Sequence, residues 1–401
     1  MAIKKNIPSS LILPKAERLE VKPNFRKLII GIPKESSFQE NRTSLTPDSV
    51  GLLVNNGHNI IIEKGSGVPA NFTDEEYLKA GASIVNSKEE VYKADFILKI
   101  EPPTASELKL MSNQQNLISA FQINTQNAGF LTELTKKNIS ALAFEFIKDE
   151  QGKIPIVRSM SEIAGTTSIL IASEYLNNAN EGKGLLLGGI SGIVPAQVVI
   201  LGAGTVAEYA TRTAIGLGAS VIVFDNSVTK LRRIQNNNNQ RVSTSTIQPK
   251  VLLKSLMRSD VVISALRIGH DRIPCIVNEN IVRQMKPGSV IVDVSIDQGG
   301  CFETSEVTNH KKPTYIKHDI IHYCVPNIAS RVSRTASMAI SNILTPLLIS
   351  IGDEGGLENL IKNNHGLRDG VYAFQGMVTN KILSNKFNLP YKDLDLIMAT
   401  R

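Results

Sequence analysis

Short apolar runs recur along the first third of the chain, separated by mixed polar and apolar stretches of helical length. Runs of this kind, bounded by turn residues, predict buried strands. Strands that alternate with helices predict a parallel sheet with helices on both faces. The runs are KLIIGIP (27–33), HNIIIEKG (58–65), DFILKI (95–100), NLISAF (116–121) and ISALAF (139–144).

A second alternating set follows a long helical pattern at 159–176 and a Gly-rich, hairpin-like stretch at 182–195. The chain is therefore predicted to be an α/β protein with two doubly wound, Rossmann-like units. After HYCVPNIASRVSRTASMAISNILTPLL (322–348) the chain is helical again, and this last stretch is too short for a third domain, so we expect it to pack back on the others. The runs of the second set are AQVVILG (196–202), ASVIVFD (219–225), DVVISAL (260–266) and SVIVDVS (289–295).

Composition excludes several classes of protein. The chain has 401 residues, 42% of them hydrophobic, which suits two globular domains. No apolar run approaches the roughly 18 residues of a membrane helix, and the N-terminal apolar stretch is too short for a secretory signal. Three cysteines, spaced for neither zinc nor a disulfide framework, favour a reducing compartment. We predict a cytoplasmic protein with no metal and no membrane partner.

The net charge of +7 comes largely from the N-terminus, where the first 27 residues hold seven Lys/Arg and two Glu. The rest of the chain is close to neutral. A nucleic-acid interface needs a basic face interleaved with aromatic side chains, and aromatic residues make up only 5% of this chain. We therefore predict no nucleic-acid partner.

The segment 198–225 carries the strongest chemical signal. Gly202, Gly204 and Ala207 fit G-x-G-x-x-G/A directly after a predicted strand and at the head of a predicted helix. The first glycine permits a tight turn, the second lets a pyrophosphate approach the backbone, and the alanine lets helix pack on strand. Asp225 closes the next strand, where a carboxylate accepts both ribose hydroxyls of NAD and repels the 2′-phosphate of NADP. This order predicts an NAD site rather than a purely structural turn.

Candidate substrate groups follow other predicted strands. Arg42 lies between the first strand and a helix start, where a guanidinium would bind a carboxylate with two hydrogen bonds; a solvated loop arginine is the alternative. Lys99 and Glu101 are two residues apart, so both project from one face at the carboxyl end of a strand, where open α/β sheets bind ligands. Asp297 follows a buried strand at the place expected for the nicotinamide ring, and we prefer this role to that of a bare loop aspartate.

Five stretches together resemble the alanine dehydrogenase and transhydrogenase alpha-subunit family along nearly the whole chain from Lys27. The last two resemble alanine dehydrogenase rather than the transhydrogenase subunit. The stretches are IGIPKESSFQENRTSLTP (30–47), MSEIAGT (160–166), GKGLLLGGISGIVPAQVVILGAGTVAEYA (182–210), MKPGSVIVDVSIDQGGCFETSEVTNHKKPTY (285–315) and HYCVPNIASRVSRTAS (322–337).

The resemblance implies a catalytic domain of residues 27–155 and 328–401, with an NAD domain, 156–327, inserted in it; residues 1–26 form an extension outside the match. It also implies a homo-oligomer that reversibly deaminates L-alanine to pyruvate and ammonia, with hydride transfer to NAD. Arg42 matches the residue that binds the substrate carboxylate, and Asp297 matches the catalytic aspartate. The implied cofactor contacts are Ser161, Asp225, Lys230, Leu266 and Asn327.

Two positions depart from the family pattern. Where the family has Lys-x-Lys-Glu-Pro, this chain has Lys99-Ile100-Glu101-Pro102, so Glu101 replaces the substrate-binding lysine. Gln122 replaces the catalytic histidine. An amide does not titrate, so this change removes a proton carrier that is typically worth about 10² to 10⁴ in rate.

Three interpretations stay open. In the first, the family reaction continues at a site that contains Gln122, with Lys99 reaching the substrate carboxylate and Glu101 acting as the base if burial raises its pKa. In the second, Glu101 lies beside an ammonium group and selects another amino acid or an opine. In the third, the chain binds NAD(H) without turnover. Among the histidines, His322 is the best substitute for the missing one, although a core role is favoured, and we expect His270 to be solvated.

Overall fold

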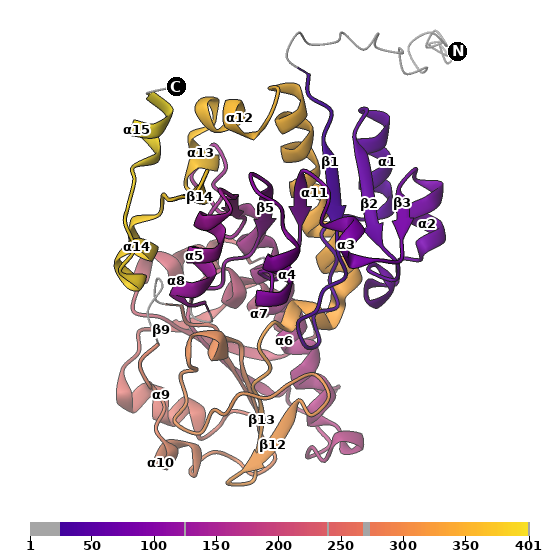
Figure 1. Ribbon diagram of the computed structural model, residues 1–401. Coiled ribbons are helices and arrows are strands. Elements are labelled where there is room, and N and C mark those ends of the chain that lie inside the picture. Colours follow the sequence, from indigo (N-terminus) through magenta and orange to yellow (C-terminus); the bar gives the residue numbers. More distant parts are fainter. Residues whose placement is uncertain (1–24, 124–125, 239, 268–272, 400–401) are drawn as a thin grey trace, which may run out of the picture.

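The computed structural model describes residues 25–123, 126–238, 240–267 and 273–399. Two sheets with flanking helices form two domains, one above the other in Figure 1. The first sheet takes strands from both ends of the chain and the second takes strands from its middle, so the second domain is inserted in the first. The predicted α/β class with two doubly wound units is confirmed. Most of the predicted N-terminal extension, residues 1–24, lies outside the described residues.

The first sheet has eight strands in the order β15-β14-β6-β5-β4-β1-β2-β3. Strands β1 to β6 are parallel, whereas β14 runs antiparallel to both β6 and β15. The C-terminal part of the chain thus extends the sheet at one edge. The bounds are β1 (Ile29–Ile32), β2 (Asn59–Glu63), β3 (Ser83–Val85), β4 (Phe96–Leu98), β5 (Asn116–Ser119), β6 (Ser140–Ala143), β14 (Val371–Phe374) and β15 (Met377–Val378).

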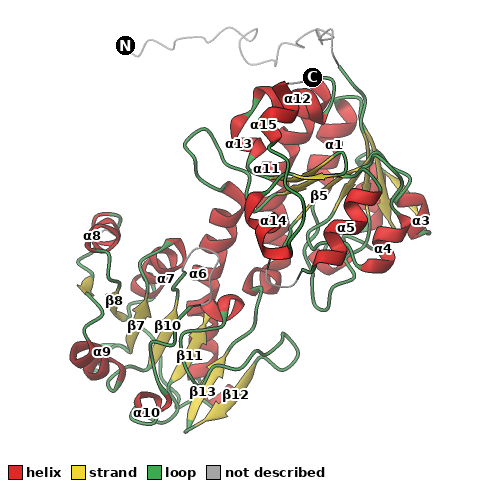
Figure 2. Cartoon of the chain, turned by 60° about the vertical axis from the view of Figure 1, so that its left-hand side comes forward, coloured by secondary structure: helices red, strands yellow, loops and turns green. Residues whose placement is uncertain are grey.

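Helices cover both faces of this sheet (Figure 2). Along β4, Phe96 and Leu98 pack into one apolar cluster and Ile97 into another, because successive side chains of a strand point to opposite faces. The helices of this domain are α1 (Pro47–Asn55), η2 (Val68–Ala70), α2 (Asp74–Lys79), α3 (Lys88–Val91), α4 (Ala105–Leu110), α5 (Ala128–Lys136), η5 (Ile328–Val332), α11 (Ser333–Asp353), α12 (Leu357–Asn363), α13 (His365–Arg368), α14 (Lys381–Phe387) and α15 (Leu394–Ala399).

The second sheet has seven strands in the order β12-β13-β11-β10-β7-β8-β9, and only β12 is antiparallel to its neighbour. The chain adds strands to one side of β7 and then to the other, so the strand order reverses at β7. Open α/β sheets bind ligands at such a reversal. The strands are β7 (Gln197–Leu201), β8 (Ser220–Phe224), β9 (Ser243–Ser245), β10 (Val261–Ser264), β11 (Val290–Asp293), β12 (Thr314–Lys317) and β13 (Ile320–Tyr323).

Helix α6 leads from the first domain into the second (Figure 2). It packs closely on α7, and Gly165 makes this possible, since a Cβ at this position would collide with the backbone of Val206. The helices of the second domain are α6 (Pro155–Leu176), η3 (Asn178–Asn180), α7 (Thr205–Gly216), α8 (Val228–Asn236), α9 (Pro249–Leu256), α10 (Glu279–Val282) and η4 (Val294–Gln298).

One helical stretch among the described residues is long and apolar enough to span a membrane by length and composition. It is Ile328–Asp353, with a mean hydropathy of 1.4, and half of its apolar window is buried inside the protein. Its buried residues, which include Ile340, Leu344 and Leu348, join the main apolar cluster of the first domain. We therefore interpret this stretch as a core helix.

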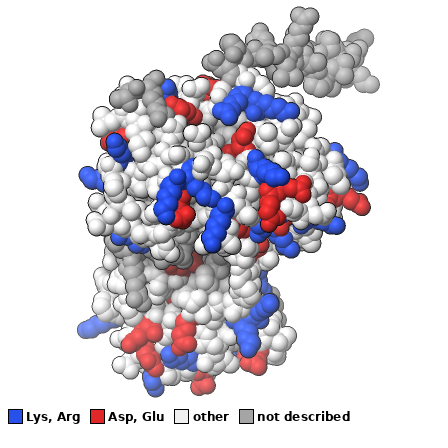
Figure 3. All heavy atoms as spheres, viewed as in Figure 1, with Lys and Arg blue, Asp and Glu red and all other residues white. Residues whose placement is uncertain are grey.

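The surface is charged but mixed in sign. On the face shown in Figure 3, basic and acidic side chains are interspersed over both domains, and the surface is indented between them.

Candidate active site

The glycine turn after β7 has the geometry of a phosphate cradle. Gly202 has φ +107°, and a Cβ there would lie 2.5 Å from the carbonyl oxygen of Ala265, so the protein itself requires this glycine. Gly204 is different, since a Cβ there would meet no atom within 4 Å. The protein leaves open space at Gly204, beside the N-terminus of α7, which fits the close approach of a dinucleotide pyrophosphate.

Asp225 follows β8 and holds the cradle in shape. One carboxylate oxygen accepts the backbone N–H of Ala203 at 2.7 Å, and the other accepts that of Ser227 at 2.7 Å. A carboxylate has about four acceptor positions, so both oxygens keep capacity for ribose hydroxyls. Ala207 is fully buried where α7 packs on the sheet. These residues suit an NAD adenosine end at β7 and β8.

The other predicted cofactor residues have varied surroundings. The Ser161 hydroxyl donates to the carbonyl of Val157 at 2.7 Å within α6. Lys230 is exposed in the first turn of α8. Leu266 follows β10 and packs partly against the second domain's core. Their contact with a cofactor stays a prediction.

Arg42 and Glu40 form an ion pair in the loop between β1 and α1. Arg42 donates from Nε to Oε1 of Glu40 at 2.8 Å and from Nη2 to Oε2 at 2.6 Å, which is a bidentate pair. The same Nη2 lies 3.7 Å from Glu101, and Nη1 contacts the sulfur of Met160 at 3.5 Å. Arg42 is therefore not the solvated loop residue of the alternative interpretation.

The loop that carries this pair is fastened to the C-terminal helices. The backbone N–H of Asn41 donates to Ser330 at 2.9 Å, and that of Thr43 donates to Ser337 at 2.9 Å. Glu40 also accepts a hydrogen bond from the side chain of Asn327 at 2.7 Å. Sequence reasoning missed Glu40, although an acid two residues before a candidate arginine was a usable signal.

The two glutamates beside Arg42 differ in pKa. Burial alone would raise the pKa of Glu40, but its pKa is lowered because the guanidinium attracts and hydrogen bonds the carboxylate. Burial raises the pKa of Glu101 to about 8, and the charge of Glu40 adds to the rise while Arg42 opposes it. A hydrogen bond joins the two carboxyl groups. At neutral pH, Glu101 is therefore mostly protonated and donates to ionised Glu40.

Gln122 follows β5 and contacts Glu101 directly. Its backbone has φ +55°, which is unusual for a residue other than glycine. Glu145 holds this conformation, since one carboxylate oxygen accepts the N–H groups of Phe121 and Gln122 at 2.7 and 3.0 Å. The Gln122 amide then donates to Glu101. The structure thus brings together the two residues that depart from the family pattern.

Lys99 is fully buried, and its ammonium lies 3.2 Å from Glu107 and 3.3 Å from Glu35. Glu35 in turn accepts the backbone N–H of Ile100 at 2.6 Å. A lysine neutralised in this way supports the strand end that carries Glu101. The predicted direct contact between Lys99 and a substrate carboxylate is not favoured by this geometry.

Asp297 belongs to η4, which follows β11. Solvent reaches the side chain, but surrounding protein atoms partly desolvate it and raise its pKa to about 6. The backbone N–H of Asn327 and the charge of Arg42 oppose this rise. Asn327 hydrogen bonds Glu40 at 2.7 Å, and its backbone N–H also helps to lower the pKa of Asp297, so Asn327 lies between the Arg42 group of the first domain and the Asp297 loop of the second.

His322 does not replace the missing histidine. It is fully buried in β13, its Nε2 bonds the hydroxyl of Thr304 at 2.9 Å, and burial lowers its pKa to about 4. The favoured core role is what the structure shows. His270 lies outside the described residues.

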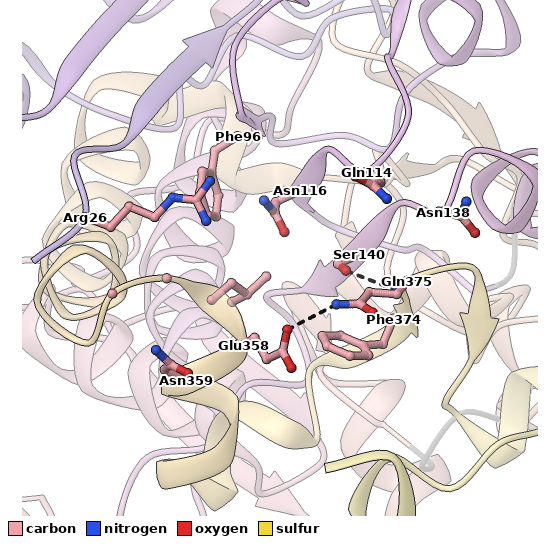
Figure 4. Close-up of a pocket in the computed structure, with 13 residues that line it drawn as sticks. Arg26, Phe96, Gln114, Asn116, Asn138, Ser140, Glu358, Asn359, Phe374 and Gln375 are labelled. Atoms are coloured by element: carbon pink, nitrogen blue, oxygen red, sulfur yellow. Dashed lines mark hydrogen bonds between the residues drawn. The ribbon is translucent and has the colours of Figure 1, made fainter. Parts of the chain in front are cut away.

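A separate cavity of about 570 Å³ lies at the amino ends of the parallel strands of the first sheet (Figure 4). Its walls include the first residues of three parallel strands, Phe96, Asn116 and Ser140, whereas Glu101 and Gln122 follow the other ends of β4 and β5. Arg26 and Glu358 also line it. This cavity is therefore no part of the site described above.

The chain matches two family models over most of its length. Residues 31–164 match the alanine dehydrogenase/PNT N-terminal domain, and residues 168–381 match the alanine dehydrogenase/PNT C-terminal domain. An alanine dehydrogenase of Staphylococcus saprophyticus is 36% identical over 370 residues, covering 92% of this chain and 99% of the relative. An alanine dehydrogenase of Methanococcus maripaludis is 37% identical, covering 91% of this chain and 98% of the relative.

Solved structures give the same result. An L-alanine dehydrogenase has a TM-score of 0.85 and 33% sequence identity, with 90% of this chain and 99% of that one covered. A transhydrogenase from Sinorhizobium meliloti has a TM-score of 0.76 at 22% identity, with 88% and 99% covered, and supports the fold alone.

We expect Asp225→Ala to weaken NAD binding about 10- to 100-fold, since a hydrogen bond to a charged group contributes roughly 1.5–3 kcal/mol. The preference over NADP should narrow, because the charge that repels the 2′-phosphate is lost. Fluorescence titrations with NADH and NADPH measure both effects, and Glu306→Ala, a change to an exposed acid, is the control. Unchanged affinity for both nucleotides would contradict the assignment.

Proposed function

Because this chain belongs to the alanine dehydrogenase and pyridine nucleotide transhydrogenase family, we propose that it reversibly deaminates L-alanine to pyruvate and ammonia. It is an NAD-dependent amino-acid dehydrogenase, and the predicted family and cofactor are confirmed. The observation that carries the alanine proposal is the bidentate pair of Arg42 and Glu40, which Asn327 of the second domain also hydrogen bonds. We assign residues 27–155 and 328–401 to substrate binding and 156–327 to NAD binding.

Arg42 orients the substrate in this proposal. Its Nε and one edge of Nη2 are held by Glu40, whereas its contacts with Met160 and Glu101 are long. The edge with the long contacts is the one offered to a substrate carboxylate.

Glu101 and Asp297 handle protons around the reacting carbon. NAD held at Gly204 and Asp225 would supply the hydride acceptor, and loss of a hydride from Cα of the amino acid would leave an imine. Glu101, with its pKa of about 8, takes a proton from the water that adds to this imine and returns a proton to the departing ammonia. Gln122 orients Glu101 through its amide, and Asp297 lies where positive charge develops beside the ring.

Two alternatives rest on the same residue. If Glu101 ionises next to a bound ammonium group, it favours a larger or basic amino acid, or an opine. If Glu101 cannot replace the imidazole of the family, the chain is a module that binds NAD(H) without turnover.

We expect the protein to reduce NAD when it is supplied with L-alanine, since Arg42 and the cradle are both present. The measurement is NADH absorbance with NAD and a panel of L-amino acids, with D-alanine as the control. Turnover of a larger or basic amino acid but not of alanine would favour the second interpretation. NAD binding without any turnover would favour the module.

We expect Glu101→Gln to lower kcat by about 10² to 10⁴, the usual contribution of a general base. In the wild type, kcat for deamination should rise as pH passes about 8, because Glu101 must lose its proton to act as a base. In Glu101→Gln, kcat should no longer rise near pH 8. In the control Glu89→Gln, a change to an exposed glutamate, this rise should remain. A limb that persists in Glu101→Gln would assign the base elsewhere.

We also propose a homo-oligomer in the cytoplasm. The hairpin-like stretch between η3 and β7 exposes several apolar side chains, a grouping that marks protein interfaces. They are Leu185, Leu186, Ile190, Ile193 and Val194, with exposures of 38 to 86%. The occupant that we assign to this patch is a second copy of the chain.

We expect Ile190→Asp combined with Val194→Asp to reduce the mass in solution, because charges within an apolar interface are costly to desolvate. Light scattering after size exclusion measures this mass. Val307→Asp, at an exposed apolar residue outside the patch, is the control and should keep the assembly of the wild type. The same mass for all three proteins would count against the patch.

A further inference from the structure

Asp293 is a fully buried acid at the end of β11, and the mechanism proposed above does not use it. Burying a carboxylate without partners costs a protein several kcal/mol. Such a group therefore needs convergent hydrogen bonds or a strong reason to be present. Asp293 lies four residues before Asp297, so its hydrogen bonds can shape the loop that carries Asp297.

The carboxylate of Asp293 accepts hydrogen bonds from residues at both ends of this loop. Oδ1 accepts the backbone N–H of Ser295 at 3.1 Å and so caps η4, the short helix that carries Asp297. Oδ2 accepts the backbone N–H of Cys301 at 3.1 Å and the hydroxyl of Ser305 at 2.7 Å. Residues 294–301 therefore wrap around one carboxyl group.

The glycines of the loop permit this wrapping. Gly300 has φ +73°, and a Cβ there would lie 2.7 Å from Oδ2 of Asp293. A side chain at this position would be strained by its backbone and would push the carboxylate away from its donors. The tight turn at Gly300 and the buried acid thus require each other.

A second set of bonds ties the loop to the neighbouring strand end. The hydroxyl of Ser264 donates to that of Ser295 at 2.8 Å, and Ser295 donates to the carbonyl of Leu266 at 2.9 Å. The helix that carries Asp297 is thereby tied to the end of β10.

We propose that Asp293 is a positioning residue, whose buried carboxylate holds loop 294–301 so that the Asp297 carboxylate faces the Arg42 group of the first domain. Its effect on turnover rests on the proposed function, because it acts through Asp297. Its effect on the loop does not. A merely structural acid would contribute to stability without affecting the protonation of Asp297.

An amide cannot replace this carboxylate. Asn has one acceptor oxygen and an NH₂ group, and three donors converge on Asp293. In Asp293→Asn, the NH₂ group would face a backbone N–H or a hydroxyl, and at least one donor would lose its partner. The substitution keeps the size of the side chain, so it removes hydrogen bonds without creating a cavity.

The experiment compares Asp293→Asn with Asp260→Asn in the full-length protein. Asp260 is a matched control, since it is also buried and accepts the backbone N–H of Gln197 at 2.9 Å, but it lies before β10, at the opposite edge of the same sheet. We expect Asp293→Asn to lower kcat about 10- to 100-fold, as misplacement of a reacting group by about 1 Å does. The pH limb due to Asp297, near pH 6 in the wild type, should shift. The Kd for NADH should change less than about twofold, because the cradle on β7 and β8 is untouched.

Hydrogen exchange provides a readout that is independent of turnover. Peptides that cover 294–301 should exchange faster in Asp293→Asn than in the wild type, whereas Asp260→Asn should leave them unchanged. If the wild type turns over no amino acid, the proposed function fails, and faster exchange still supports the positioning role. Unchanged exchange in the loop, or an unchanged kcat and pH profile in an active enzyme, overturns the proposal.

Ser305→Ala covers the case in which Asp293→Asn does not fold. It removes one donor to the buried carboxylate and leaves the two backbone donors in place. We expect a smaller loss of kcat and a smaller increase in exchange, both in the same direction. Wild-type behaviour of Ser305→Ala in both measurements would also overturn the proposal.

Discussion

The bidentate pair between Arg42 and Glu40 is the interaction on which the proposed active site depends. A guanidinium that leaves water is stable only when a well-placed carboxylate neutralises it. Glu40 supplies that carboxylate and, through a hydrogen bond from Asn327, also reaches the loop that holds Asp297. One pair therefore orients the group that we propose to bind the substrate and connects it to the second domain. Without Glu40, Arg42 would lose its bidentate partner, and the side chain of Asn327 would lose its acceptor in the first domain.

The sequence predicted those parts of the site whose residues all lie in one short segment of the chain. The roles proposed for Gly202 and Asp225 depend on a strand, a turn and a helix in succession, so a linear pattern carries them. Glu40 depends on Asn327, which is 287 residues away, and no spacing reveals such a partner. Lys99 illustrates the same limit. Period-two alternation predicts that Lys99 and Glu101 share a face, but it says nothing of Glu107 and Glu35, the acids that form ion pairs with Lys99.

The sequence likewise predicted some strands of the fold and missed others. Apolar runs that alternate with helices predicted the parallel strands, because each such strand is buried on both faces and reads as a continuous apolar segment. The antiparallel edges carry a weaker pattern. Strand β12 is only partly buried, and β14 pairs with β6, more than 200 residues before it along the chain. The expectation that the C-terminal stretch packs back on the rest was right, but its helical pattern gave no sign that it adds two strands to the first sheet.

The two departures from the family pattern form a single unit rather than two losses. Gln122 donates to Glu101, so the amide at one position matches the carboxyl group at the other. Because the two side chains are hydrogen bonded, we expect the effects of substitutions at these two positions not to be additive. The family pairs a cation with a titrating imidazole, whereas this chain pairs a titrating carboxyl group with an amide. The group that we propose to carry the proton therefore lies at the end of β4, next to Arg42, rather than at the end of β5. The proposed chemistry is therefore retained by moving the acid toward the carboxylate end of the substrate.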